Sequence, residues 1–259
     1  MISLFKNLYN YRQMMFSLIH RELRGRYKGS VLGFLWTFLN PLLQMFVYTF
    51  VFSIIMRSDI EKYYIFLFVA LIPWIFFSTS LAGGCGCVLA SGDMVKKIYF
   101  PREVLPISFV TTAFINMLYC FVVVFAALLV SGIGFSLKPL LYLPIFLLVE
   151  YILALGITLF AAALTVYIRD LQHILGIVVM AWQFLTPVMY SAKRVPERYI
   201  KLFYLNPMTP IIEGIRSILY YKEVPQVSTL LAATLFGVFF VIFGEIVFSR
   251  LQRGFAEEL

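Results

Sequence analysis

The chain has 259 residues, of which 62% are hydrophobic and 13% charged, and its mean hydropathy is +0.91. These values exclude an ordinary soluble domain and indicate an integral membrane protein. The formal net charge is +8, so the positions of the basic residues decide the predicted orientation in the membrane.

The first thirty residues predict an amphipathic helix in the inner membrane interface, attracted by anionic lipid. We expect no cleavable signal, because the first long apolar run begins only near Val31, behind many Lys and Arg residues. The apolar face alternates steps of four and three residues: Leu4, Leu8, Tyr11, Met15 and Leu18. The polar face carries Lys6, Gln13, His20 and Arg24. Gly25, Gly29 and Gly33 follow at four-residue steps and allow a bend or close packing.

Six apolar runs predict six transmembrane helices, since a span needs about 20 mostly apolar residues. They cover residues 31–56, 63–88, 104–130, 139–167, 171–190 and 229–249, of which 171–190 is the shortest. The predicted fold class is therefore an all-α polytopic membrane protein. We divide it into an interface segment, 1–30, and a six-helix transmembrane domain, 31–259.

The distribution of Lys and Arg predicts that both termini are cytoplasmic. Twelve of the 21 basic residues flank the spans on the side of the termini, and three lie in the short loops opposite. The segment 191–228 adds the other six to the outer side, which weakens the signal without reversing it.

The outer stretch LNPMTPIIEGIRSILYY, Leu205 to Tyr221, predicts a short helical hairpin that enters the membrane and turns back, buried against protein. Asn206-Pro207 and Thr209-Pro210 each place an N-cap residue before a proline, which favours a helix start. Glu213 and Arg216 are three residues apart and are expected to pair. The alternative is an amphipathic helix lying flat on the outer surface.

Two spans carry polar and aromatic stripes, which suit sugars better than ions. On the first span we expect Trp36, Asn40, Gln44 and Tyr48 to share a face, and on the fifth Gln183 and Tyr190. The alternative is that the amides hold helices together. Glu150 lies at mid-membrane depth, and we favour a structural, hydrogen-bonded role for it over a proton relay.

The inner loop from Ser91 to Ser108 predicts a short helix that ends before Pro101. Its expected apolar face, Met94, Val95, Ile98 and Tyr99, opposite Lys96 and Lys97, fits a groove on a partner or rests on lipid. No GxxxxGK[ST] sequence is present, so any ATP would be bound by another polypeptide. The cysteines and the two histidines show no metal-ligand pattern.

Four stretches in order resemble the permease subunits of type-2 ABC exporters for lipid-linked polysaccharides such as O-antigen, capsule and teichoic acid precursors. They are RELRGRYKGSVLGFLWTFLNPLLQM (Arg21 to Met45), YFPREVLPIS (Tyr99 to Ser108), YIRDLQHILGIVVMAWQFLTPVMYS (Tyr167 to Ser191) and YLNPMTPIIEGIRSILY (Tyr204 to Tyr220). Together they span most of the chain, which makes the resemblance specific.

The resemblance implies a homodimer in the bacterial cytoplasmic (inner) membrane, with two copies of a separate subunit that binds ATP and Mg²⁺. It implies no cofactor, no ATPase site and no nucleic-acid partner for this chain. The residues that it places in contact with the ATPase are Met94, Val95, Ile98, Tyr99, Phe100, Arg102 and Glu103. The outer gate helices would contain Asn206, Pro207, Pro210, Glu213 and Arg216. The glycan path would contain Trp36, Asn40, Gln44, Tyr48, Gln183 and Tyr190.

The basic residues at the cytoplasmic end of the first span, which we call the basic inner mouth, have two interpretations. Arg21, Arg24, Arg26 and Lys28 either recognise a pyrophosphate headgroup or form the ordinary positive flank of a first span. Rival functions are a type-2 ABC permease for drugs or small lipids, an ion-gradient-driven secondary transporter, and a membrane enzyme acting on polyprenyl lipids. The last two call for deep charged residues or clusters of acids and histidines.

Overall fold

The computed structural model describes residues 9–25 and 29–259, in which all regular elements are helical. The long helices are α2 (Arg12–Gly25), α3 (Trp36–Thr49), α4 (Tyr63–Gly84), α7 (Val104–Val130), α9 (Leu143–Tyr167), α10 (Leu171–Leu185) and α13 (Val227–Leu251). The short helices are η1 (Gly33–Leu35), η2 (Phe50–Ile55), α5 (Cys87–Ala90), α6 (Gly92–Lys97), α8 (Leu137–Leu140), η3 (Ala192–Arg194), α11 (Glu197–Phe203), α12 (Met208–Arg216), η4 (Ser217–Tyr221), η5 (Gln252–Gly254) and α14 (Phe255–Glu258).

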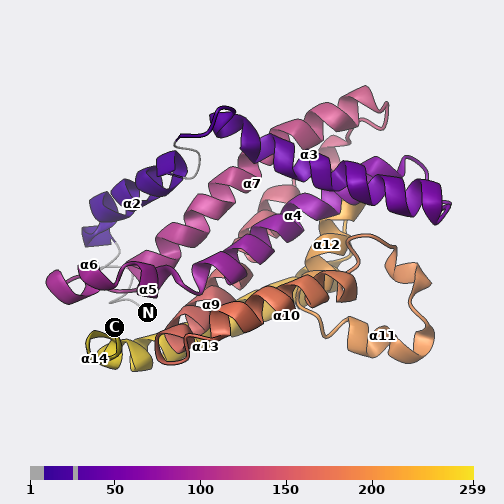
Figure 1. The fold of residues 1–259 in the computed structure, drawn as a ribbon. Helices are drawn as coiled ribbons and strands as arrows, with labels where there is room; N and C mark the ends of the chain where they lie inside the picture. Colours follow the sequence, from indigo (N-terminus) through magenta and orange to yellow (C-terminus); the bar gives the residue numbers. More distant parts are fainter. Residues whose placement is uncertain (1–8, 26–28) are drawn as a thin grey trace.

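Helix α4 forms the centre of the bundle. It is apolar on every side, and a helix of that kind is stable only when other helices surround it. Helices α3, α7, α9, α10 and α12 all pack against it (Figure 1). Most of its side chains, from Tyr63 to Phe77, are therefore buried within the chain.

Helices α9 and α13 cross with their backbones in contact. A Cβ on Gly156 would overlap the backbone of Phe240, and one on Gly244 would overlap the carbonyl of Gly156. Small residues permit this close approach between membrane helices, where apolar burial adds no driving force. The crossing fixes the last span to the centre of the bundle.

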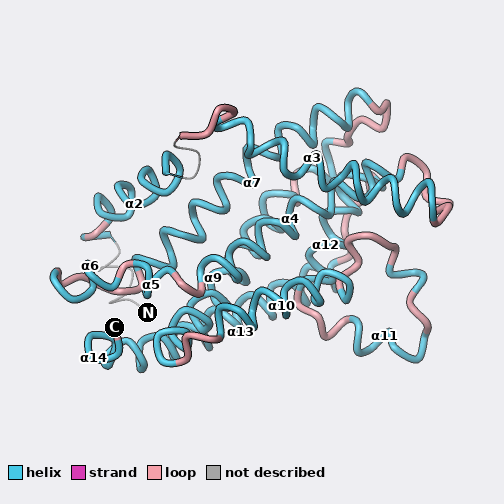
Figure 2. Tube along the Cα trace, viewed as in Figure 1, coloured by secondary structure: helices cyan, strands magenta, loops and turns pink. Residues whose placement is uncertain are grey.

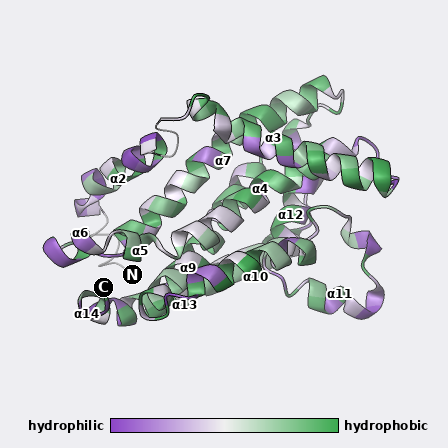
Figure 3. Cartoon of the chain, viewed as in Figure 1, coloured by the Kyte–Doolittle hydropathy of each residue, from purple (hydrophilic) through white to green (hydrophobic). Residues whose placement is uncertain are grey.

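Helix α2 and the short elements gather at the two ends of the bundle. Helices α2, α6 and α14 lie at one end, together with the C-terminus, and α11 and α12 lie toward the other (Figure 1). We call these the inner and outer ends, after the predicted orientation. Loops connect the helices at both ends (Figure 2). Apolar residues dominate the long helices, whereas polar residues are frequent on α2, α6 and α11 (Figure 3).

Five helices are long and apolar enough to cross a membrane, counted over the described residues. They are Gly33–Ile55, Tyr63–Gly84, Val104–Val130, Leu137–Tyr167 and Val227–Glu258, which confirms five of the expected apolar runs. The sixth run is helical only over Leu171–Leu185, 15 residues, or about 22 Å at 1.5 Å per residue. Thr186 to Met189 continue this run as a buried, non-helical segment. The sixth span stays a prediction.

The segment before the first span bends at glycine, as the sequence indicates. Gly29 has a φ of +85° and Gly33 a φ of +48°, values that side chains disfavour. Met15 and Leu18 of α2, and Tyr11 just before it, face a buried cluster at the inner end that includes Phe100 and Phe255. This confirms the predicted apolar face within Arg12–Gly25. Leu4, Lys6 and Leu8 lie outside the described residues.

Candidate functional site

A polar pocket of about 250 Å³ lies between α3, α4 and α7. Trp36, Asn40 and Gln44, three residues of the predicted path, line it from α3. Thr79 and Asn116 line it from α4 and α7. The residues of one predicted stripe therefore meet in one cavity at membrane depth, together with an amide from another span.

The other predicted path residues lie elsewhere. Tyr48 packs, half-buried, against the main core. Gln183 is on α10, outside the pocket. Tyr190 follows α10, and its hydroxyl donates to the carbonyl oxygen of Phe184 at 3.0 Å. The structure thus brings Trp36, Asn40 and Gln44 together in one pocket. Tyr48, Gln183 and Tyr190 lie outside it.

Asn206 joins the outer segment to the end of α10. Its side-chain oxygen accepts from the backbone N–H of Met208, the first residue of α12, at 3.0 Å, and from the Trp182 indole at 3.0 Å. Its amide nitrogen donates to the Thr186 hydroxyl at 2.9 Å. The helix start expected at Asn206-Pro207 agrees with the structure to within one residue, since α12 begins at Met208. Trp182 and Thr186 are partners that the sequence analysis did not assign. Their spacing of 20 residues or more from Asn206 gives no local signal.

The outer segment contains one buried helix where the sequence analysis expected two starts. Thr209 and Pro210 lie inside α12, which continues into η4, because the Thr209 hydroxyl donates to Phe203 at 3.1 Å instead of capping a new helix. Residues 207–212 are all buried. The burial against protein is as expected, whereas the second helix start at Thr209-Pro210 is wrong.

The expected ion pair between Glu213 and Arg216 is also absent from the described salt bridges. Arg216 is 2% exposed and donates to the carbonyl oxygens of Val188 and Tyr190, at 3.0 and 3.4 Å. Its guanidinium carbon lies 3.7 Å from the centre of the Phe66 ring, a cation–π contact. Glu213 accepts from the Tyr204 hydroxyl at 2.8 Å, and burial together with this carboxylate raises the pKa of Tyr204 to about 12.

At the inner end, α6 does not present the apolar face expected for it. Val95 is 5% exposed and Met94 is half-buried, and both pack within the inner-end cluster. The helix ends at Lys97, and Ile98 is extended, so Ile98 and Tyr99 lie beyond the helix. Ile98 is 57% exposed and Tyr99 95%, beside exposed Lys96 and Lys97. The exposed surface is therefore Lys96 to Tyr99.

The residues of the FPRE stretch face this chain's own C-terminal segment. Phe100 is buried, and the Arg102 guanidinium donates to the carbonyl of Gln252. The Gln252 amide in turn donates to the Glu103 carboxylate at 2.6 Å. Phe255 is fully buried beside them. Contact of Arg102 and Glu103 with the ATPase stays a prediction, and in this structure both side chains are engaged within the chain.

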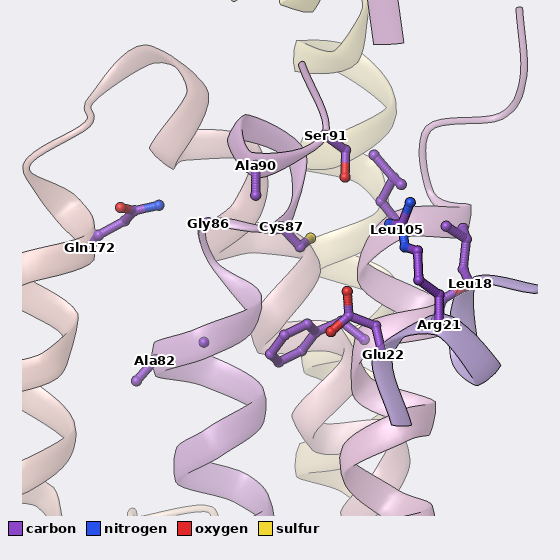
Figure 4. Close-up of a pocket in the computed structure, with 13 residues that line it drawn as sticks. Leu18, Arg21, Glu22, Ala82, Gly86, Cys87, Ala90, Ser91, Leu105 and Gln172 are labelled. Carbon is purple, nitrogen blue, oxygen red and sulfur yellow. The ribbon is translucent and has the colours of Figure 1, made fainter. Parts of the chain in front are cut away.

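A second cavity, of about 450 Å³, opens at the inner end between α2, the end of α4, α5, α7 and the start of α10 (Figure 4). Arg21, from the predicted basic mouth, lines it, as do Glu22 and Ser91, and Gln172 lines it from the opposite side. Arg24 is exposed. Arg26 and Lys28 lie outside the described residues. The cavity therefore carries a carboxylate, Glu22, beside the basic group.

Glu150 is 0% exposed on α9, and neither carboxyl oxygen has a hydrogen-bond partner in the described structure. The hydrogen-bonded role expected for it is wrong in this state. Among the described residues, no group of three or more His, Cys, Asp or Glu side chains is placed to hold a metal ion.

Comparison of the amino-acid sequence with known proteins identifies the family of this chain. The family model described as ABC-2 type transporter matches residues 13–220. The chain is 37% identical to an O-antigen export system permease protein RfbA of Myxococcus xanthus, over the whole of both chains. It is 31% identical to an RfbA protein of Klebsiella pneumoniae over 93% of each chain. It is 25% identical to a polysialic acid transport protein, KpsM, of Escherichia coli over 76% of this chain and 77% of that protein.

The matched region contains every candidate residue discussed above except those before residue 13 and those of the C-terminal segment after residue 220. On the extent of these matches, the chain belongs to the ABC-2 type transporter family.

Proposed function

We propose that this chain is the permease subunit of an ATP-driven exporter that moves a lipid-linked polysaccharide of the O-antigen, capsule or teichoic acid type across the bacterial cytoplasmic membrane. The full-length similarity to an O-antigen export permease carries the proposal. The pocket with Trp36, Asn40 and Gln44 supports it, because amides beside a flat ring suit a sugar. The chain's own role is transport, with no catalytic site.

The proposed assembly is a homodimer with two copies of a separate subunit that binds ATP and Mg²⁺. Helix α3 supports a path between the copies, because its outer face is hardly covered within one chain and carries exposed Asn40 and Gln44. Polar amides at this depth need protein or water beside them. The glycan path is then formed where two such faces meet.

The contact with the ATPase is proposed for the exposed stretch Lys96 to Tyr99, held by the buried Val95 and Phe100 on either side. A movement of the ATPase would act on α6 as a lever. Replacing Tyr99, 95% exposed, with Ala should reduce coupling without lowering the amount of inserted protein. Export and ATP hydrolysis at wild-type levels in Tyr99→Ala would remove this residue from the contact.

Recognition of a pyrophosphate headgroup is proposed for the inner cavity and its rim, through Arg21 and Arg24. An Arg side chain offers a fork of donors to phosphate oxygens. Arg24 is exposed, so Arg24→Glu should leave the fold intact while export falls. If Arg24→Glu inserts normally and exports as much glycan as wild type, the headgroup role fails. The basic residues then form only the ordinary positive flank of the first span.

The proposed orientation puts both termini in the cytoplasm. Single cysteines at Lys96 and Lys201, both exposed, would report on opposite ends of the bundle in a variant without Cys85, Cys87 and Cys120. A membrane-impermeant thiol reagent added to intact cells should label position 201 and not 96. The reverse pattern would overturn the orientation.

The function is tested by affinity purification from the native membrane in mild detergent, followed by mass spectrometry. A near-stoichiometric protein with a Walker A motif is the expected result, and surface glycan should disappear when the gene is disrupted and return with the intact gene. Glycan that stays on the surface while a drug or small lipid is retained would favour the permease for such compounds. A chain that purifies alone, even after crosslinking, would favour a gradient-driven transporter.

A further inference from the structure

We propose that the pocket between α3, α4 and α7 is a subsite for one sugar residue of the exported glycan, and that Asn116 is its principal hydrogen-bonding group. The inference rests on the proposed export of a polysaccharide. Asn116 belongs to neither polar stripe in the sequence, and it is the carboxamide that α7 adds to the pocket, beside Ala113, Met117 and Cys120.

The Asn116 side chain is a buried amide without a hydrogen-bond partner among the described residues. It lies near the middle of α7 and is only 8% exposed, and both its amide nitrogen and its amide oxygen lack a hydrogen-bond partner in the described structure. A carboxamide offers two donors and an acceptor. Leaving such a group unpaired costs about 1–3 kcal/mol, and at membrane depth bulk water cannot satisfy it. A bound polar molecule would remove this cost.

The lining of the pocket combines hydrogen-bonding groups with flat apolar surface. Thr79 and the amides of Asn40 and Gln44 supply the polar part, while Trp36 and Phe76 supply rings. The Trp36 indole nitrogen already donates to the Ser30 hydroxyl at 3.0 Å, which fixes the ring from outside the pocket. A pyranose has hydroxyls at its edge and C–H groups on its faces, so it matches such a lining.

The size and position of the pocket favour one ring of a longer chain. Its volume, about 250 Å³, is slightly below the range of about 300–1,000 Å³ typical of small-ligand sites and is too small for an oligosaccharide. Asn40 and Gln44 line the pocket and are also exposed on the open face of α3. A glycan that moves along this face would therefore place single residues against Asn116 in turn.

Asn116→Leu separates this role from helix packing. Replacing an unpaired buried amide with an apolar group of similar size should leave the melting midpoint of the purified complex unchanged or raised. The concentration of native lipid-linked glycan that half-maximally stimulates ATP hydrolysis should rise about tenfold, the effect of losing one or two hydrogen bonds to the ligand. Export to the cell surface should fall with it.

The matched control is Thr112→Val. Thr112 lies one turn earlier on the same helix and is also buried, but it does not line the pocket. Its hydroxyl donates to the carbonyl oxygen of Ser108 at 2.8 Å. This substitution removes a buried polar group of α7 without touching the subsite. We expect its half-stimulating glycan concentration to match wild type.

A second measurement detects the sugar directly. A photoreactive benzoylphenylalanine in place of Phe76, which lines the pocket, should capture the native lipid-linked glycan on irradiation and give a glycan-stained adduct. Asn116→Leu in the same protein should weaken the adduct. Adduct formation that is indifferent to Asn116, or no adduct at all in a complex that exports glycan, would overturn the subsite.

The outcomes distinguish the subsite from the proposed function itself. A wild-type complex that moves no glycan refutes the function. If the wild type exports glycan and Asn116→Leu does so equally well at the same half-stimulating concentration, only the subsite fails. A lowered melting midpoint together with lost export would mark Asn116 as a helix-packing residue and would also overturn the proposal.

Discussion

Replacing Arg216 with Lys keeps the positive charge of the outer segment but removes the planar guanidinium. In the structure this group reaches the carbonyl oxygens of Val188 and Tyr190 with two different nitrogens and lies over the Phe66 ring. A lysine ammonium on a flexible stem reaches one of these carbonyls and cannot stack flat on the ring. We expect Arg216→Lys to weaken the attachment of α12 to the segment that follows α10.

The size of the effect follows from the hydrogen bond that Lys cannot replace. A hydrogen bond to a charged group contributes about 1.5–3 kcal/mol to the free energy of unfolding. A loss of about 1 kcal/mol lowers the melting midpoint by about 2–4 °C in a chain of this size. The midpoint of Arg216→Lys, measured by intrinsic fluorescence in one detergent beside wild type, should therefore fall by roughly 3–12 °C.

Glu213→Gln is the matched control, because an ion pair with Glu213 would predict the opposite pattern. Lys pairs with a carboxylate nearly as well as Arg does, so Arg216→Lys would then be tolerated and Glu213→Gln would be costly. Among the residues that the structure describes, Glu213 accepts only from Tyr204, which a glutamine oxygen can also do, so Gln should cost no more than about 1 kcal/mol. An unchanged midpoint in Arg216→Lys, or an equal fall in Glu213→Gln, would refute the reasoning.

Two further pairs of substitutions, each a test with its control, probe the packing of the bundle and of its inner end. Gly156→Ala should push α9 and α13 apart because the added methyl meets backbone atoms, which should lower the free energy of unfolding by about 1–3 kcal/mol or more. Gly176→Ala is the control, because open space surrounds Gly176, and its melting midpoint should be unchanged or raised. Equal midpoints for the two variants would contradict the close crossing. Phe255→Ala should cost about 3–5 kcal/mol, since the ring is fully buried, whereas Phe16→Ala, at a ring 62% exposed, should change little. A wild-type midpoint in Phe255→Ala would show that α14 is not held in the inner-end cluster.

The elements that the sequence predicts well are those set by local pattern. Continuous apolar runs indicate the long helices, and the run 104–130 coincides with α7. Asn206 before Pro207 predicts the start of α12 to within one residue, because a helix start depends on neighbouring residues. The glycines before the first span bend the chain for the same local reason.

The contacts that the sequence does not predict join residues far apart in the chain. Arg102 and Gln252 are 150 residues apart, and Arg216 and Val188 are 28 apart, so no spacing rule points from one to the other. The i to i+3 rule suggests a Glu213 partner for Arg216, but the folded chain brings the carbonyl oxygens of Val188 and Tyr190 to the buried guanidinium instead. Tertiary structure decides which partner is within reach.

Asn116 shows why the candidate site was only partly predictable. Asn40 and Gln44 stand out because they repeat along one face of their helix, whereas Asn116 is a single amide in an apolar span. Only the packing of α7 against α3 and α4 brings it to the same pocket. The structure therefore adds to the stripe a residue that periodicity has no means of finding.

The central claim is that this chain moves a lipid-linked polysaccharide with energy from a partner ATPase. Its most direct test is transport into inverted vesicles that contain the purified chain and its copurified ATPase, with the glycan extracted from the native host supplied outside. We predict that the glycan becomes protected from an added glycan-cleaving enzyme only when both proteins and hydrolysable ATP are present. Protection without the ATPase, driven by an imposed ion gradient, or no protection under any of these conditions, would contradict the account.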